Sequence, residues 1–382
     1  MANNNQPLRV LYVNGGTMDM GGISTYMMNY YRHFDAERIQ VDFLTQGDGE
    51  NRYSEEIARR NGNVFQIPNK GSNFFLNITE TRKIMQKGNY DIVHSHADAG
   101  NGLVLAIARQ CNIPVRISHS HSTRVMNHSI IRRGLNSIQK PLIKWYATDF
   151  WGCSRGACTW LYGSEKKATV IRNAIDLNAF GFNQNIRNDI RDALGIKGKK
   201  IAICQIGHLN YIKNHLFSLE VISKLVEKGR EFCFFIIGDG ENRMLLEKEV
   251  SRKKLDDVVR FLGNQANINQ LLQAMDILLM PSIFEGFPIT LIEGQATGIK
   301  CLVSETITHE AKLIAQTTYL PIVGAECIDQ WVEKIEPVAH RVGRMKELTD
   351  AGFNIEIEAK KVMDRYESLF RINNMIRDND IN

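Results

Sequence analysis

Apolar and polar residues follow one pattern over the first 180 residues, in which short apolar runs alternate with stretches of helical periodicity. The chain opens with an apolar run at 8–14 (LRVLYVN), a glycine-rich turn and a helical pattern near 22–34. Further apolar runs, with helical stretches between them, lie at 41–45, 63–67, 90–96 and 115–121. Such alternation predicts a parallel sheet with helices on both faces.

The same pattern begins again near residue 199. Apolar runs lie at 199–207, 232–240, 258–263, 276–282 and 301–304, and helical patterns near 214–228, 241–251, 267–274 and 289–297. The polar stretch at 183–200 contains two glycines and few β-branched residues. It is therefore the best candidate for a join between two domains.

We predict an α/β protein with two Rossmann-like, doubly wound domains, at 1–182 and 196–355, that face each other across a cleft. The charged amphipathic pattern at 356–376 predicts a helix, and we expect residues 356–382 to cross back and pack on the first domain. In such sheets ligands bind beyond the carboxyl ends of the strands. The loops that follow the apolar runs are therefore where chemistry is expected.

Length and composition agree with this organisation. A chain of 382 residues, 43% of them hydrophobic, is long for a single core. No apolar run nears the ~20 residues of a membrane span, and the start MANNNQPLRV lacks the features of a secretory signal. The seven cysteines are scattered, without a C-x-x-C pair. We expect a cytoplasmic protein with reduced thiols.

Glycines follow the first strand of each predicted domain. Gly21 and Gly22 lie just before an apolar helix, where backbone N–H groups and the helix N-terminus favour an anion. The dinucleotide pattern G-x-G-x-x-G is not met, and a turn without a ligand explains the glycines equally well. In the second domain Gly207, His208 and Lys213 follow a strand. A bound anion would explain a lysine at a helix start, although a solvated lysine is the more common case.

Two glutamates stand eight residues apart in PSIFEGFPITLIEG, at 281–294. Pro288 suits a helix start, and Gly298 suits a helix end. Glu285 is then on a loop and Glu293 a turn inside a helix, so the two do not share one helical face. Helix N–H donors with two acceptor side chains suit a nucleotide sugar better than a glycosidase pair. The alternative is that Glu285 caps its own loop and Glu293 is solvated.

Several segments, in order along nearly the whole chain, resemble the retaining glycosyltransferases of family 4, which have the GT-B fold. PSIFEGFPITLIEGQATG resembles their E-x7-E signature, and GGISTYMMNYY their N-terminal Gly-Gly loop. The segments VIRNAIDLNAF, QIGHLNYIKNH and IIGDGENRMLLE resemble other motifs of the family. The closest similarity is to the capsular and exopolysaccharide transferases of bacteria.

The resemblance implies which residues bind the donor. In the family the second glutamate, here Glu293, holds the ribose hydroxyls, and the first, here Glu285, lies by the sugar. An arginine and a lysine usually neutralise the diphosphate; Lys213 matches the lysine, but His208 stands at the arginine position. The donor-binding residues expected on this basis are Gly21, Gly22, His208, Lys213, Gly238, Gly263, Glu285, Gly286, Phe287, Pro288, Ile289, Thr290 and Glu293.

His208 departs from the family pattern. An ordinary histidine, with a pKa of ~6.5, is mostly neutral at pH 7 unless a phosphate raises that pKa. We expect His208 to donate a hydrogen bond and to be protonated in the complex. The segment Gly238-Asp239-Gly240 is interpreted either as a phosphate or base contact or as a tight turn.

The resemblance also implies a first-domain histidine facing the anomeric carbon. The segment VRISHSHSTR offers His119 and His121, and the Ser-Thr-Arg that follows favours His119, which we name as catalytic with Lys213 and Glu285. By strand periodicity His121 lies on the same face. His94 and His96 end a neighbouring strand and are acceptor-side candidates. The alternative for His119 and His121 is a structural role as a hydrogen-bonded histidine at the end of a strand.

No metal or other cofactor is expected. No D-x-D appears, and no His/Asp cluster has the sequence spacing of a metal site. The resemblance implies a front-face reaction in which the diphosphate leaves as the acceptor hydroxyl enters on the same side, with electrostatic stabilisation of the leaving group. A covalent route through Glu285 is the alternative.

The acceptor is expected to be a glycan or a lipid-linked glycan. Residues 130–151 place Arg132, Arg133, Lys140 and Lys144 among apolar residues, which suits an anionic membrane surface and equally suits ordinary surface helices. The formal charge of +5 is compatible with either, and no nucleic-acid partner is expected. The alternatives to a UDP-sugar transferase are a UDP-sugar 2-epimerase of the same fold and a non-catalytic nucleotide-sugar-binding protein.

Overall fold

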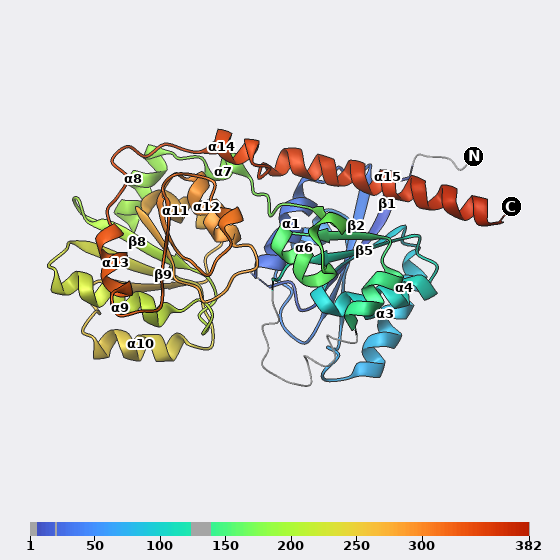
Figure 1. Ribbon diagram of the computed structural model, residues 1–382, viewed down its shortest axis with the longest axis horizontal. Helices are drawn as coiled ribbons and strands as arrows, with labels where there is room; N and C mark the ends of the chain where they lie inside the picture. Colours follow the sequence, from blue (N-terminus) through green and yellow to red (C-terminus); the bar gives the residue numbers. More distant parts are fainter. Residues whose placement is uncertain (1–5, 20, 124–138, 382) are drawn as a thin grey trace. The chain divides into compact units, whose positions relative to one another are not determined.

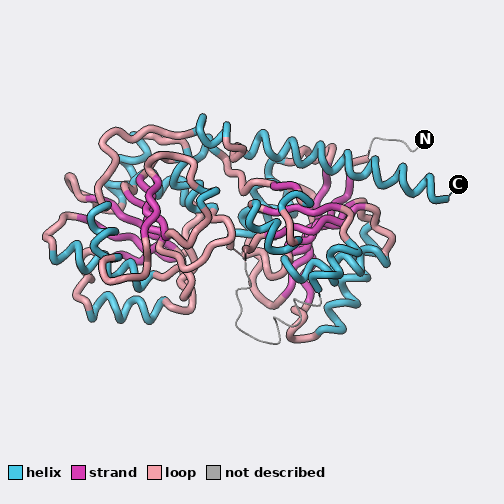
Figure 2. The backbone as a smooth tube through the Cα atoms, viewed as in Figure 1, coloured by secondary structure: helices cyan, strands magenta, loops and turns pink. Residues whose placement is uncertain are grey.

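The computed structural model describes residues 6–19, 21–123 and 139–381, and divides into two compact units. The first unit comprises residues 1–174 and 355–382, and the second comprises residues 175–354. In each, a parallel sheet lies between helices (Figure 1). Figure 2 shows the strands gathered at the centre of each unit, with helices around them.

The first unit contains a seven-stranded parallel sheet in the order β3-β2-β1-β4-β5-β6-β7. Its strands are β1 (Leu8–Asn14), β2 (Ile39–Gln46), β3 (Val64–Ile67), β4 (Ile92–His96), β5 (Val115–Ser120), β6 (Asp149–Gly152) and β7 (Thr169–Val170). Its helices include α1 (Gly22–His33), α2 (Ser54–Arg59), α3 (Phe74–Gly88), α4 (Asn101–Gln110), α6 (Arg155–Tyr162) and α15 (Ile355–Ile381), with a further helix at 139–146.

The second unit contains a six-stranded parallel sheet in the order β10-β9-β8-β11-β12-β13. Its strands are β8 (Ile201–Ile206), β9 (Phe232–Ile237), β10 (Val259–Gly263), β11 (Ile277–Met280), β12 (Lys300–Ser304) and β13 (Thr317–Leu320). Its helices are α7 (Leu177–Phe180), α8 (Gln184–Ala193), α9 (His215–Glu227), α10 (Arg243–Arg252), α11 (Ile268–Ala274), α12 (Ile289–Ala296), α13 (Cys327–Lys334) and α14 (Met345–Asp350).

The boundary between the two units lies earlier in the chain than the sequence predicts. The first unit ends at Ala174 rather than at residue 182, and residues 184–193 are helix α8 of the second unit rather than a join. Asn183 caps this helix, and Arg187 and Arg191 pair with Asp276, at 2.5 and 3.2 Å. The polarity that suggested a linker therefore serves ion pairs within the second unit.

The C-terminal helix α15 belongs to the first unit, in agreement with its amphipathic pattern. Its Tyr366 is fully buried: the ring stacks on Trp151 with centroids 5.4 Å apart, and its hydroxyl lies 3.0 Å from that of Tyr12. At the surface, Arg38 pairs with Asp364 and Glu367 of α15. The sheet of the first unit is thus covered in part by a helix that begins 185 positions (355 − 170) after the end of β7, the nearest strand of that sheet in the sequence.

Candidate functional site

The crevice of a doubly wound sheet lies where the strand order reverses. In the second unit this point falls between β8 and β11, which are neighbours in the sheet. The loops that follow these two strands are joined by hydrogen bonds. Ile283 N–H donates to the Ile212 carbonyl at 2.8 Å, and the Asn214 side chain donates to the Pro281 carbonyl at 3.1 Å.

An ion pair joins the same two loops. Lys213 Nζ lies 2.6 Å from Glu285 Oε1, which also accepts the Ser282 hydroxyl at 2.7 Å. Both charged side chains are largely buried. Glu285 Oε2 accepts no hydrogen bond from the part of the chain that the structure describes. Gly207 leaves room for the lysine, since a Cβ there would lie 2.9 Å from Lys213 Cε.

Buried polar atoms without partners surround Lys213. The Gln205 side chain donates to the Lys213 carbonyl at 2.7 Å, while its own Oε1 has no partner among the described residues. Both ring nitrogens of His215, at the start of α9, are likewise buried and unpaired there. Burial, with smaller contributions from Lys213 and His208, lowers the pKa of His215 to about 3.

Ser282, Gln205 and His215 were not predicted as site residues. Gln205 lies near the end of β8, Ser282 follows β11, and His215 begins the helix after β8. Their places near the carboxyl ends of these two strands could have suggested them. The residue types alone carried no signal, because serine, glutamine and a lone histidine are common in loops.

Glu293 lies inside helix α12, as predicted, one turn beyond its N-terminus. Pro288 is the N-cap, and no side chain caps the helix. The Glu293 carboxyl has no hydrogen-bond or ion-pair partner in the described ranges 6–19, 21–123 and 139–381, and burial raises its pKa to about 7. It is therefore not an ordinary solvated glutamate. An unpaired carboxyl behind uncapped helix N–H groups can accept hydroxyls beside a bound anion.

The segment between the glutamates contributes chiefly backbone. The Phe287 side chain is buried and stacks on Phe353, with ring centroids 5.6 Å apart, and Ile289 is also buried. Gly286 and Thr290 are partly accessible. The side chains of Phe287 and Ile289 thus hold the loop in place and leave the backbone as the part that can contact a ligand.

The other predicted donor residues have varied surroundings. His208 is exposed, and its Nε2 lies 2.8 Å from Glu241 Oε2. Gly238, with φ of +132°, is required by packing, because a Cβ would lie 2.1 Å from the Gly207 carbonyl oxygen. Gly263, with φ of +67°, borders open space. A tight approach of two loops, rather than a ligand, is sufficient to explain Gly238.

In the first unit the Gly-Gly loop leads into α1. Gly21 is the N-cap, but its N–H donates to Asp19 Oδ1 at 2.8 Å. A Cβ on Gly22 would meet nothing within 4 Å. Gly22 is therefore open to a ligand in this structure, whereas an anion at Gly21 would have to displace the Asp19 carboxylate.

The four predicted histidines form one buried cluster beneath α1 and α15. His94 Nε2 lies 3.0 Å from His119 Nδ1, and His96 Nδ1 lies 2.9 Å from His121 Nε2. The His119 and His121 rings stack with centroids 4.2 Å apart, which confirms that they share a face. Burial lowers the pKa of all four histidines, that of His121 to about 3.

Two expectations about these histidines change. The sequence showed no spacing typical of a metal site, yet one ring nitrogen each from His94, His96 and His119 lies within 4.8 Å of the others. Residues 25 positions apart meet because β4 and β5 are parallel neighbours. His119 is wholly buried, while His121 follows the end of β5 and retains slight exposure. The role of His119 at the anomeric carbon stays a prediction.

The basic stretch at 130–151 lies partly outside the described residues, with Arg132 and Arg133 among those not described. Lys140 is not free for a membrane, because its Nζ donates to the Trp160 carbonyl at 2.9 Å and sits over the Trp160 ring. Lys144 and Trp145 are exposed. No helix within residues 6–19, 21–123 and 139–381 is long and apolar enough to cross a membrane.

Comparison with known proteins decides the family. The family model described as Glycosyltransferase Family 4 matches residues 20–179, and that of Glycosyl transferases group 1 matches residues 186–351. A putative glycosyltransferase, EpsF of Bacillus subtilis, is 32% identical over 351 residues, covering 90% of each chain. The chain belongs to family 4 of the glycosyltransferases. The predicted motifs, in their predicted order, therefore identified it correctly.

Other family members and solved structures agree. A galactosyltransferase of Escherichia coli, named for UDP-Gal and GlcNAc-diphosphoundecaprenol, is 25% identical over 304 residues, covering 75% of this chain and 76% of its own length. HepE of Anabaena, solved with UDP and glucose, superposes with a TM-score of 0.72 at 14% identity over 97% of this chain and 99% of its own. WaaG, a lipopolysaccharide glycosyltransferase, gives 0.67 at 15% identity over 96% and 99%. These structures establish the GT-B fold for this glycosyltransferase.

Proposed function

We propose that this glycosyltransferase moves a sugar, with retention and without a metal, from a UDP-sugar to a hydroxyl of a glycan or lipid-linked acceptor in bacterial surface polysaccharide synthesis. The observation that carries the proposal is the Lys213–Glu285 ion pair at the strand-order reversal of the second unit, together with the unpaired Glu293 carboxyl. These are the cation and two acceptors that a nucleotide sugar requires.

Donor binding is divided between the two glutamates and the start of α12. Glu293 has no protein partner in the described chain, so its carboxyl is available to accept the two ribose hydroxyls. The uncapped N–H groups at the start of α12 offer positive partial charge to the diphosphate. Glu285 Oε2, which has no hydrogen-bond partner in the described part of the chain, accepts a hydroxyl of the sugar.

Lys213 stabilises the departing diphosphate. Its ammonium is held by Glu285, and its aliphatic chain passes over Gly207. Preorganised donors of this kind lower a barrier by about 3 to 4 kcal/mol per donor, because no reorganisation is needed as charge develops. The acceptor hydroxyl then enters on the face from which the diphosphate leaves, and a diphosphate oxygen takes its proton. Glu285 is poorly suited as a nucleophile, since Lys213 and Ser282 bind Oε1 and stabilise the carboxylate charge that an attack through Oε2 would need.

The choice of UDP and of the acceptor rests on relatives. The Anabaena structure contains UDP and glucose, and the name of the Escherichia coli relative gives UDP-Gal and a diphosphoundecaprenol acceptor. We propose the same classes of donor and acceptor here, with contact between the first unit and an anionic membrane when the acceptor is lipid-linked.

A donor panel tests the proposal against its alternatives. UDP release is measured for several UDP-sugars, with and without undecaprenyl-diphosphate-linked acceptors, and the sugar is recovered for analysis. Acceptor-dependent release of UDP is the expected result. Conversion of the sugar to its 2-epimer without net transfer would establish an epimerase instead, and saturable binding without turnover would establish a non-catalytic binding protein.

A further inference from the structure

We propose that His94, His96 and His119 form a buried site for one divalent transition-metal ion in the first unit, and that zinc is the ion it suits best. The site lies between β4 and β5 and is structural: it holds the two strands together, and His119 serves in it as a ligand rather than as the residue predicted to face the anomeric carbon. It is therefore independent of the proposed function, which needs no metal.

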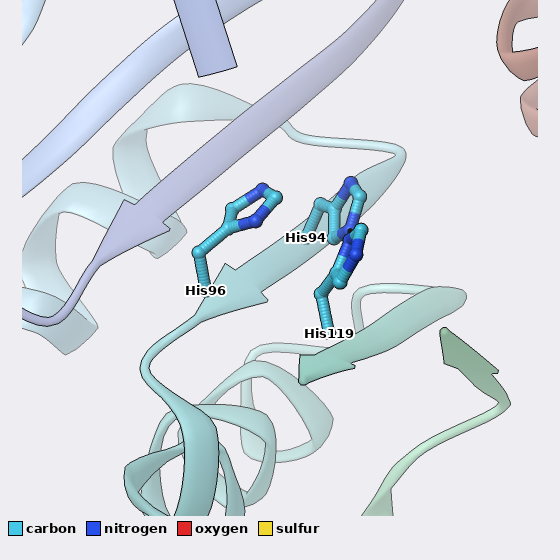
Figure 3. Close-up of side chains that lie close together, drawn as sticks. All are labelled: His94, His96 and His119. Carbon is cyan, nitrogen blue, oxygen red and sulfur yellow. Dashed lines mark hydrogen bonds between the residues drawn. The ribbon is translucent and has the colours of Figure 1, made fainter. Parts of the chain in front are cut away.

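The three rings project to one side of two neighbouring strands (Figure 3). One nitrogen from each lies within 4.8 Å of the other two. Tetrahedral zinc with bonds of about 2.0 to 2.1 Å to nitrogen requires nitrogens about 3.4 Å apart. His94 Nε2 and His119 Nδ1 now share a hydrogen bond of 3.0 Å, so metal binding would replace that hydrogen bond and turn the rings toward the ion.

Unpaired nitrogens point to a missing ligand. His96 Nε2 and His119 Nε2 are buried and have no hydrogen-bond partner in the described chain, and both side chains are wholly inaccessible. A buried polar atom without a partner destabilises the folded state, because it has lost its hydrogen bonds to water. A metal ion bound by His96 Nε2 would remove that destabilisation for His96, and His119 would offer the ion one of its two ring nitrogens.

The surroundings also fit a metal site. A ligating histidine usually donates its other ring N–H to an oxygen or another acceptor, which fixes its tautomer. His94 Nδ1 lies 2.6 Å from the Tyr366 hydroxyl, and His96 Nδ1 lies 2.9 Å from His121 Nε2. Nδ1 of His94 and Nδ1 of His96 are therefore already held by a second partner. Nε2 of each of these rings is the nitrogen left for a metal ion.

The set of ligands selects the ion. Three imidazoles without thiolate or carboxylate suit zinc and its neighbours in the first transition series, and do not suit calcium or magnesium. Asp98 supplies nearby negative charge: its buried carboxylate accepts the backbone N–H of His121 at 2.7 Å and the Ser122 hydroxyl at 2.8 Å. The fourth position of a zinc ion would be filled by water or by a rearranged His121.

The test uses the full-length chain without a histidine tag, treated with chelator and then dialysed. Zinc chloride titrated into it should bind at about one ion per chain, and cobalt(II) loading should give the visible absorption of a tetrahedral site. Bound zinc should also raise the melting temperature. Absence of saturable binding at one zinc per chain would overturn the proposal and leave the cluster as a neutral hydrogen-bonded network.

Variants locate the ion. His96→Gln and His119→Gln should each abolish stoichiometric zinc binding, and Tyr366→Phe should weaken it about 10- to 100-fold through the loss of a supporting hydrogen bond. His215→Gln is the matched control, since His215 is also buried with both ring nitrogens unpaired but lies in the second unit, and it should bind zinc as the wild type does. Equal zinc binding by the wild type and His96→Gln would place the ion elsewhere and refute the site; the titration of the wild type decides the question even if a variant does not fold.

Discussion

Glu285 and Glu293 belong to one sequence motif but have different surroundings. Glu285 is held by Lys213 and Ser282, whereas Glu293 has a raised pKa and no partner among the residues that the structure describes. In the proposed function the first acts beside the cation that stabilises the leaving group, and the second accepts the ribose hydroxyls. This difference argues against a simple acid/base couple.

The two glutamates should therefore fail in different ways when changed. Glu293→Ala should raise the dissociation constant for UDP about 10- to 100-fold, with a smaller effect on kcat. Glu285→Gln, which keeps the shape but loses the charge, should lower kcat about 100-fold and leave UDP binding within about threefold. Calorimetric titration of UDP and steady-state kinetics measure both. Equal losses of kcat with unchanged UDP binding at both positions would restore the acid/base interpretation.

The raised pKa of Glu293 predicts a pH dependence of donor binding. Ribose hydroxyls stabilise the carboxylate, so binding lowers a pKa that is about 7 in the free protein and releases a proton. Affinity for a UDP-sugar should consequently fall as pH decreases below 7, approaching about tenfold per pH unit. Glu293→Gln should bind more weakly but without this dependence. A pH-independent wild type between about pH 5.5 and 8 would contradict the assignment.

The raised pKa of Glu293 gives the free energy of unfolding the opposite pH dependence: stability falls as pH rises. The folded state holds the Glu293 proton more tightly than the unfolded state, so this residue contributes stability at low pH that is lost as pH rises from 4.5 through about 7. Glu293→Gln should thus be more stable than the wild type at about pH 8, by on the order of 1 to 3 kcal/mol, and similar to it at about pH 4.5. Thermal unfolding at the two pH values measures the difference.

His208 is expected to act as a donor to the diphosphate despite its place in an exposed pair with Glu241. His208→Ala should lower kcat/KM about 10-fold, the loss of one hydrogen bond to a charged group. The matched control Glu241→Gln removes the competing partner and should leave kcat/KM unchanged or raise it. Unchanged turnover in His208→Ala would remove His208 from the site.

At the scale of elements, apolar runs predicted the strands that are central in each sheet and buried. β1 matches the predicted 8–14, and β8, β9, β11 and β12 lie within or one residue beyond their predicted runs. β6, β7 and β13 were not identified, because they are short and partly polar. Helix α8 was taken for a linker, since its stabilising contacts are ion pairs with Asp276, 80 to 90 residues away, which no local pattern reports.

One arginine holds the ends of two helices in the second unit. The buried Arg341 guanidinium donates to the carbonyls of Leu272, Gln273, Met275 and Thr297, at 2.7 to 2.9 Å, around the ends of α11 and α12. Arg341→Lys cannot satisfy four carbonyls in one plane and should lower the free energy of unfolding by about 2 to 4 kcal/mol.

Denaturant unfolding measures this loss. Arg252→Lys is the matched control, because Arg252 pairs with Glu249 on the surface of α10 and its replacement should leave the free energy of unfolding almost unchanged. Similar stability losses in the two variants would show that Arg341 does not join α11 to α12 as described.

At the scale of the whole molecule, the order of motifs was enough to predict the GT-B fold and the glycosyltransferase family. The contacts that define the candidate site were not predictable, because they join distant residues. Lys213 and Glu285 are 72 positions apart, and His94 and His119 are 25 apart. The order of strands in the sheet brings each pair together, and local periodicity does not predict that order.

The same limit applies to burial. The sequence placed His119 at the reaction centre, and the structure encloses it among three other histidines. Whether a strand-end histidine faces outward depends on the helices that cover it, here α1 and α15, and α15 comes from the far end of the chain.

In the proposed function the second unit binds a nucleotide sugar and stabilises its leaving group, and the acceptor hydroxyl enters on the face from which the diphosphate leaves. The most direct measurement is the anomeric configuration of the product formed from an α-linked UDP-sugar, followed by proton NMR together with UDP release. We expect an α-linked product, formed in an amount equal to the UDP released. A β-linked product would contradict the proposed function.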